Sequence, residues 1–400
     1  MADVGGQWRE VATASGLLAG DGSLAPTVFA RMTALATQTG AINLGQGFPD
    51  TDGPSEVLDA ARSAISDGFN QYPPGRGVPE LRRAIADHQQ RWYDLSVDPD
   101  TEVLVTAGAT EAIAATVLAL CSPGDEVVVL EPYYDSYAAT IALGGAVRRP
   151  VPLRWPDFKL DVDALAAAFS DRTRLVLLNN PHNPTGRVFS RTELEAVARL
   201  AQERDVVVVT DEVYEHLTFD GRRHIPLATL PGMADRTITI SSAGKTFSVT
   251  GWKIGWLHAR AELVDAVTTV KQFLTFVSGG PFQPAVATGL ALPDETFAAG
   301  AESLQVRRDQ LVAGLTAAGL EVSVPEGTYF VVADAAPLGV TDAASFCLQL
   351  PERVGVVAVP MSAFYDDAAP ARSLVRFACC KRPEVIAEAS RRLATLSPKP

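Results

Sequence analysis

Cysteine is scarce in this 400-residue sequence, which contains only Cys121, Cys347, Cys379 and Cys380. None of them belongs to a CxxC pair, and the adjacent Cys379 and Cys380 cannot easily bridge each other. A chain of this length can bury a large core, so it needs no disulfides for stability. The sequence therefore predicts buried free thiols in a reducing compartment, and we expect a cytoplasmic protein.

Long hydrophobic runs are also missing. No uninterrupted apolar run approaches the roughly 18 residues of a membrane span, and the N-terminus lacks the basic and apolar regions of a signal peptide. Positive charge is in deficit as well, because the formal net charge is −13. We therefore expect no membrane association and no nucleic-acid partner, since nucleic-acid binding needs a basic face.

Several common cofactor motifs are absent. The five histidines include no HExxH pair, so no catalytic metal is expected. The GxG sequences at 45–47 and 75–77 lack the third glycine of a dinucleotide fingerprint, because Asp50 and Glu80 stand in its place. The sequence GKT at 244–246 matches the end of a P-loop, but that motif needs glycine where Thr239 stands.

Strand and helix patterns alternate from residue 47 to residue 290. The expected strands are short, continuous apolar runs, and the expected helix at 191–203 opens with a capping box formed by Ser190 and Glu193. Continuous apolar strands spaced by helices indicate an α/β fold with a mostly parallel sheet that is covered on both faces. The strands are expected at 103–106, 126–130, 175–178, 206–209 and 237–240.

The pattern changes after residue 290. Pro293 and Asp294 interrupt the helical pattern, and a charged stretch with helical character then continues to about Gly319. Shorter strands are expected at 321–324, 329–333, 354–359 and 374–378. We interpret residues 47–290 as a large domain and residues 291–400 as a smaller α+β domain.

Two polar segments follow buried strands of the large domain. TDEVY at 210–214 supplies Asp211 and Tyr214, and SSAGKTF at 241–247 supplies Lys245. Ligands of open α/β sheets bind at the carboxyl ends of the strands, so both segments are expected to face one crevice. A lysine that can form an imine, a carboxylate that can keep a heterocycle protonated and a phenol meet the needs of pyridoxal 5′-phosphate (PLP).

Further motifs occur in the same order as in a known family. They are NPTG at 183–186, SSAGKTFSVTGWKIGW at 241–256 and VRFA at 375–378. With TDEVY, they make the chain resemble the fold-type I PLP enzymes of the class I/II aminotransferases, from about Asn43 to Phe377. The resemblance implies that the N-terminal segment, residues 1–46, joins the small domain.

The resemblance also implies how the cofactor is held. Lys245 matches the Schiff-base lysine, and Asp211 should pair with the pyridine nitrogen. Tyr214 and Asn183 match the residues that bind the ring oxygen, and Tyr134 in EPYY matches the stacking aromatic, although Tyr133 and Tyr137 could be confused with it. The phosphate cup is expected to consist of Gly108, Ala109, Thr110, Ser242 and Lys253, where many relatives have arginine in place of Lys253.

Three more residues are expected to complete the site. Arg376 matches the arginine that holds the substrate α-carboxylate as a bidentate pair, although an arginine on an edge strand would ordinarily be solvated. Gly47 matches a glycine whose backbone lies along the substrate, and the resemblance implies that Asn183 contacts the substrate as well. Tyr72 matches a tyrosine that reaches the phosphate from the neighbouring subunit, so the resemblance implies a homodimer with a shared active site.

The expected reaction is ping-pong transamination between an amino acid and a 2-oxo acid. Within this family, three segments look most like the subgroup of kynurenine, methionine and N-succinyldiaminopimelate aminotransferases. They are FDG at 219–221, IPLATLPG at 225–232 and PEGTYF at 325–330. KQFLTF at 271–276 and GPFQPAV at 280–286 look most like the actinobacterial N-succinyldiaminopimelate enzymes of lysine biosynthesis. The resemblance therefore implies N-succinyl-LL-2,6-diaminopimelate as the first choice of amino donor, with 2-oxoglutarate as acceptor, or the reverse reaction.

Alternatives remain at this point. A kynurenine, methionine or aromatic aminotransferase and a PLP β-lyase would share the cofactor site. A PLP-sensing regulator would carry a DNA-binding segment before the fold, and only about forty residues precede the match. The negative charge also disfavours the regulator.

Overall fold

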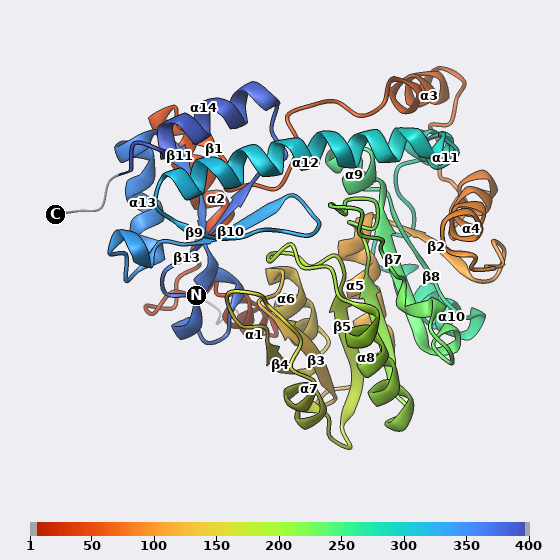
Figure 1. Ribbon diagram of the computed structural model, residues 1–400. Helices are drawn as coiled ribbons and strands as arrows, with labels where there is room; N and C mark the ends of the chain where they lie inside the picture. The colour runs from red at the N-terminus through yellow and green to blue at the C-terminus, as the bar shows by residue number, and fades with distance from the viewer. Residues whose placement is uncertain (1–5, 397–400) are drawn as a thin grey trace, which may run out of the picture.

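The structure is a computed structural model that describes residues 6–396. Among these residues the largest sheet has seven strands in the order β2-β8-β7-β6-β5-β3-β4 (Figure 1). Strands β4, β3, β5, β6 and β7 are parallel, and β8 is antiparallel to both of its neighbours. The expected, mostly parallel sheet is therefore confirmed. The strands are β2 (Val103–Thr106), β3 (Glu126–Glu131), β4 (Val147–Pro152), β5 (Thr173–Asn179), β6 (Val207–Asp211), β7 (Thr237–Ser242) and β8 (Gly255–His258).

Helices cover both faces of this sheet. Alternate residues of the central strands point to opposite sides, so Val127 and Val129 pack with one set of helices and Val128 with the other. The first set is α5 (Gly108–Leu120), α6 (Asp135–Leu143) and α10 (Ala261–Lys271), and the second is α7 (Val162–Ala168) and α8 (Arg191–Glu203). The capping box predicted for α8 is confirmed, because Ser190 and Glu193 bond each other's backbone N–H groups.

A third group of helices packs at the β2 edge. Helix α11 (Phe282–Leu290) packs against α3 (Ser55–Ser66) and α4 (Pro79–Tyr93). Their apolar side chains surround Val103, Val105 and Trp256 of the adjoining strands. Ala243 of the short helix α9 (Ala243–Thr246), which carries Lys245 and follows β7, packs in the same apolar cluster.

A smaller, four-stranded antiparallel sheet has the order β12-β13-β10-β9 within the described residues. Figure 1 shows the long helix α12 extending from α11, beside the large sheet, to the small sheet, where it packs against α14. The remaining elements are β9 (Glu321–Ser323), β10 (Phe330–Asp334), β12 (Val359–Pro360), β13 (Leu374–Ala378), α12 (Asp294–Ala317), α13 (Ala343–Val354) and α14 (Pro383–Leu393).

The N-terminal segment contacts both parts of the molecule. Helix α2 (Val28–Thr39) packs on α13, and β1 (Ile42–Asn43) pairs in parallel with β11 (Val356–Val357). Helix α1 (Trp8–Ala14) packs instead on α6 of the large sheet. The domain boundaries after residues 46 and 290 stay predictions, and residues 1–5 and 397–400 lie outside the described part.

One expected strand was wrong. Residues 354–359 were expected to form a single strand, but α13 continues to Val354, and β11 and β12 are separated by Ala358 and belong to different sheets. Strand β11 pairs with the N-terminal β1, a partner that no local pattern can reveal. None of the helices formed by residues 6–396 has both the length and the apolar character needed to cross a membrane.

Candidate active site

One cavity of about 280 Å³ lies where the carboxyl ends of the large sheet's parallel strands meet the small sheet. It brings together every residue that the sequence placed in the site except Tyr72. These lining residues are Gly47, Gly108, Ala109, Thr110, Tyr134, Asn183, Asp211, Tyr214, Ser242, Lys245, Lys253 and Arg376. Sequence analysis did not identify other lining residues, which include Phe29, Gln46, Phe48, Ile113, Asn179 and Phe330.

Asp211 and Lys245 give the cavity opposite charges in a buried setting. Asp211 is the last residue of β6, and its Oδ2 accepts a hydrogen bond of 2.6 Å from Tyr137 Oη. Burial raises the pKa of Asp211, while the bond from Tyr137 opposes that shift. Burial also lowers the pKa of Lys245, which the charge of Asp211 opposes. The lysine is thus closer to its neutral, nucleophilic form than a solvated lysine would be.

The three tyrosines near residue 134 have separate contacts. Tyr134 lines the cavity, as expected. Tyr133 instead donates a hydrogen bond to Asp366, and Tyr137 donates to Asp211. The sequence offered a weak signal for Tyr137, which lies three residues after Tyr134 and so on nearly the same face of helix α6.

A cation and several hydroxyl groups converge at the start of α5. Lys253 Nζ lies 3.5 Å from Thr110 Oγ1, and a side chain added at Gly108 would place its Cβ 3.2 Å from the same Nζ. Gly255, the first residue of β8, also lies close to the start of α5, because a Cβ at this position would be 2.5 Å from the carbonyl carbon of Gly108. Because the N-terminus of a helix presents unpaired N–H groups, this arrangement suits an anion beside Ser242.

Arg376 is buried, with 2% of its surface exposed, and the expectation that it lies on an edge strand was wrong. Its strand β13 lies between β12 and β10. Its Nη1 donates to Asn183 Oδ1 at 3.0 Å, and the guanidinium carbon lies 3.9 Å from the ring centroid of Phe330. Burial lowers the pKa of Arg376 to about 10, so the group stays charged at neutral pH.

The charge of Arg376 has no ion-pair partner among residues 6–396, and its Nε has no hydrogen-bond partner there. A buried cation without a carboxylate is costly unless an anion binds it. The arrangement therefore suits a ligand that carries a carboxylate.

Gly47 forms part of the same wall of the cavity. Tyr329 Oη donates a 2.5 Å hydrogen bond to the carbonyl oxygen of Gly47. A Cβ at position 47 would lie 2.4 Å from Phe330 Cζ and 2.7 Å from Tyr329 Cε2, so no larger residue fits without movement. The ring of Tyr329 also meets that of Tyr214 edge to face, with centroids 5.3 Å apart. Tyr329 thus connects the backbone at Gly47 to Tyr214.

Tyr72 lies apart from the cavity lining of its own chain. Its side chain is 83% exposed, and its ring contacts Phe276 at a centroid distance of 5.7 Å. The single chain does not bring Tyr72 to the other predicted residues.

A second polar cluster lies outside the cavity lining. His88 Nε2 and His216 Nε2 are 2.7 Å apart, and Glu215 accepts hydrogen bonds from Tyr93 and Ser241, each at 2.7 Å. His88, Glu215 and His216 could together hold a metal ion, but each of them already has these partners within the cluster. The expectation of no catalytic metal stays a prediction.

Comparisons with known proteins agree with this site. The family described as "Aminotransferase class I and II" matches residues 39–393. A probable N-succinyldiaminopimelate aminotransferase of Mycobacterium tuberculosis is 56% identical, covering 94% of this chain and 97% of that protein. The methionine aminotransferase of Escherichia coli is 40% identical, covering 93% and 96%. The solved structure of the M. tuberculosis N-succinyldiaminopimelate aminotransferase covers 93% of this chain and 98% of its own, with a TM-score of 0.91 and 57% identity.

Proposed function

The chain belongs to the class I and II aminotransferases and depends, as they do, on PLP; from this premise we propose that it transfers the amino group of N-succinyl-LL-2,6-diaminopimelate to 2-oxoglutarate, or catalyses the reverse reaction. The 56% identity to the M. tuberculosis relative, over nearly the full length of both chains, carries this choice of substrate. The apolar side chains of Phe29, Phe48 and Ile113, which line the cavity, support it because they suit the methylene chain of such a substrate.

The residues of the cavity fit PLP. The anion site formed by Gly108, Thr110, Ser242 and Lys253 would hold the phosphate, and the absence of a Cβ at Gly108 leaves room for it beside Lys253. Tyr134 would stack on the ring, and Asn183 and Tyr214 would bind its oxygen. When bound, PLP supplies an electron sink for the bond that is broken at the substrate Cα.

The protein's own groups would carry out the rest of the reaction. Asp211 would keep a ring nitrogen protonated, and Tyr137 holds this carboxylate in place by its hydrogen bond. Lys245 Nζ would take the proton from the substrate Cα, which its lowered pKa favours. Arg376 would bind the α-carboxylate, and the carbonyl and rings near Gly47 would confine the substrate beside it.

We also propose a homodimer in which each chain contributes Tyr72 to its partner's site. The exposed apolar side chains of Tyr72, Phe69 and Phe273 support this, because exposed apolar patches commonly mark protein interfaces. A Cβ at Gly280 would lie 2.9 Å from the carbonyl oxygen of Phe69, so the two segments that carry the patch lie side by side. The patch comprises Ile65, Phe69, Tyr72, Phe273, Leu274 and Phe276.

The proposed cellular location is the cytoplasm. Within residues 6–396 all four cysteines are free, and Cys347, Cys379 and Cys380 are buried. Burial raises the pKa of the Cys380 thiol to about 11, which keeps it in the unreactive thiol form. Free thiols of this kind fit a reducing compartment.

A screen of amino donors with 2-oxoglutarate tests the proposed substrate. N-succinyl-LL-2,6-diaminopimelate should give the highest kcat/KM, ahead of methionine and kynurenine. The E. coli methionine aminotransferase, at 40% identity, makes methionine the second candidate. A higher kcat/KM for methionine would overturn the first choice. Product analysis separates a β-lyase, since only transamination converts the donor to its 2-oxo acid while forming glutamate.

A further inference from the structure

A turn of the small sheet is inserted between two loops of the large sheet. The turn comprises residues 325–328 and leads directly into β10. The N–H of Glu326 donates to the carbonyl oxygen of Gly186 at 2.8 Å, and the carbonyl of Glu326 accepts from the N–H of Phe219 at 2.9 Å. A Cβ at Gly186 would lie 2.3 Å from Pro325 Cβ, so the loop and the turn are in close contact.

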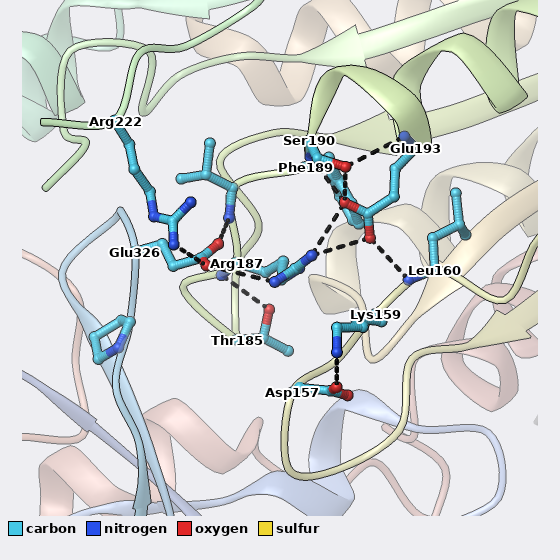
Figure 2. A network of polar contacts seen from close by, with 12 residues as sticks. Asp157, Lys159, Leu160, Thr185, Arg187, Phe189, Ser190, Glu193, Arg222 and Glu326 are labelled. Carbon is cyan, nitrogen blue, oxygen red and sulfur yellow. Dashed lines mark hydrogen bonds and ion pairs between the residues drawn. The ribbon is translucent and has the colours of Figure 1, made fainter. Parts of the chain in front are cut away.

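The side chain of Glu326 adds an ion-pair network to this junction. Its Oε1 lies 2.8 Å from Arg222 Nη2 and 3.4 Å from Arg187 Nη1, and its Oε2 accepts from the N–H of Val188 at 3.0 Å. Figure 2 shows Arg187 between Glu326 and Glu193. Arg187 Nη2 lies 3.0 Å from Glu193 Oε2. The side chains of Arg187 and Glu326 are only 16% and 19% exposed, whereas that of Arg222 is 50% exposed.

The loop of the large sheet and the turn of the small sheet each lead to residues of the proposed carboxylate site. The large-sheet loop carries Asn183, three residues before Gly186. The small-sheet turn leads into Phe330, whose ring contacts Arg376. Asn183 and Arg376 share the 3.0 Å hydrogen bond, so a shift of the turn relative to the loop would separate them.

The conformation of Thr328 shows that the turn is held in place. Thr328 has a φ of 64°, which β-branched residues adopt only under constraint. It is fully buried, and its N–H donates at 2.8 Å to the carbonyl oxygen of Leu217, which lies in the loop after β6. This bond and the contacts of Glu326 both hold the turn against loops of the large sheet.

We propose that Glu326 is a positioning residue for the reaction: paired with Arg187, it clamps the small-sheet turn to the large-sheet loop and so keeps Asn183 and Arg376 aligned for the substrate carboxylate. Neither Glu326 nor Arg187 lines the cavity, so they act through these neighbours and not on the substrate. Loss of one partner leaves a half-buried charge and the N–H of Val188 poorly satisfied. The inference rests on the proposed role of Arg376.

Glu326→Gln tests the clamp because it removes the charge and keeps the shape. We expect KM to rise about tenfold for both the amino donor and the oxo acceptor, with kcat within about twofold and PLP still bound. Glu326→Asp keeps the charge but shortens the side chain, so it should lie between wild type and Glu326→Gln. It also serves if Glu326→Gln does not fold. Arg222→Gln is the matched control, because it removes the solvent-exposed partner of the same carboxylate and should leave KM unchanged.

A binding measurement separates positioning from stability. 2-Oxoglutarate has no amino group, so it binds the PLP form without turnover, and calorimetry gives its Kd. Glu326→Gln and Arg187→Gln should each weaken this binding about tenfold, and the double variant should be no weaker than the weaker single variant.

An unchanged Kd and KM in Glu326→Gln, or a fall in Tm without either change, would overturn the clamp. Arg376→Ala, measured in parallel, must raise KM. If it does not, the proposed carboxylate site fails whatever Glu326 does.

Discussion

Arg376 Nη1 donates a 3.0 Å hydrogen bond to Asn183 Oδ1, although the two residues are 193 positions apart and lie in β13 of the small sheet and in the loop after β5 of the large sheet. Arg376 is proposed to bind the substrate carboxylate, and Asn183 to contact both the cofactor and the substrate. The bond therefore places the two binding functions in contact before either ligand arrives.

The identity of the reactive lysine can be tested chemically. Borohydride reduction of the holoenzyme, followed by peptide mapping, should attach the phosphopyridoxyl group to the peptide that contains Lys245. The assignment is clear because the sequence has only six lysines. A label on Lys253, which is proposed to contact the phosphate, or on Lys271 would contradict the site.

Asp211→Ala should retain some PLP but lose most turnover. Without the carboxylate the ring nitrogen loses its proton, and electrostatic effects of this kind are worth several kcal/mol, so kcat should fall on the order of a hundredfold or more. Tyr137→Phe is the matched control, because it removes only the bond to Asp211 Oδ2 and should cost much less. A kcat for Asp211→Ala within about threefold of wild type would rule out the assigned role.

Arg376→Ala should raise KM for every amino and oxo substrate, because all of them carry an α-carboxylate. The expected cost is roughly 2–5 kcal/mol in kcat/KM, as for the loss of a buried charge pair. In the wild type the pKa of Arg376 is lowered to about 10, so the guanidinium loses its proton as the pH rises through this value. KM should therefore be constant near neutral pH and rise above about pH 10. A selective effect on one substrate class would contradict a common carboxylate site.

Mixing inactive Tyr72→Ala dimers with inactive Arg376→Ala dimers tests the proposed dimer. If Tyr72 serves the partner's site, one site of each heterodimer carries both defects and the other is intact. Random exchange should then restore about a quarter of wild-type activity. The absence of recovery after proven subunit exchange would show that Tyr72 acts within its own chain.

Acid sensitivity should depend on the buried histidines. Burial lowers the pKa of His88 to about 3, whereas an unfolded histidine titrates near 6.5. Between these values the unfolded state binds the proton and the folded state does not, so stability falls as the pH falls through this range. His88→Phe should reduce the slope of the unfolding free energy between pH 6 and 4 by about 1.4 kcal/mol per pH unit at most. Urea unfolding in excess PLP measures this, and parallel slopes would refute it.

The sequence predicted five of the seven strands of the large sheet, because most of these are apolar runs with a polar residue at the carboxyl end, but it did not predict β4 or β8. Asp211, for example, follows three valines and Thr210 in β6 and lines the cavity as expected. The environment of the residues in the small sheet was harder to predict from the sequence. Arg376 alternates with Val375 and Phe377, which on an edge strand would point it to solvent. Aromatic rings from distant segments, such as Phe330 and Phe364, enclose it instead.

The contacts that define the site's geometry also depend on distant partners. The bond between Tyr137 and Asp211 joins α6 to β6. The local sequence places Tyr137 on nearly the same helix face as Tyr134, but it does not show which of the two meets the carboxylate. The pairing of Glu326 with Arg187 is of the same kind, since both residues lie in loops 139 positions apart. Local patterns predict which residues lie at the ends of strands, but not which of them meet.

The position of β13 between β12 and β10 has a consequence for biosynthesis. A ribosome releases Asp211 and Lys245 long before it releases Arg376, and the small sheet cannot close until its central strand has emerged. A nascent or prematurely terminated chain therefore contains the segments that carry Asp211 and Lys245, β6 and α9, while it still lacks the arginine for the carboxylate. Tight binding of an amino acid thus becomes a property of the finished polypeptide alone.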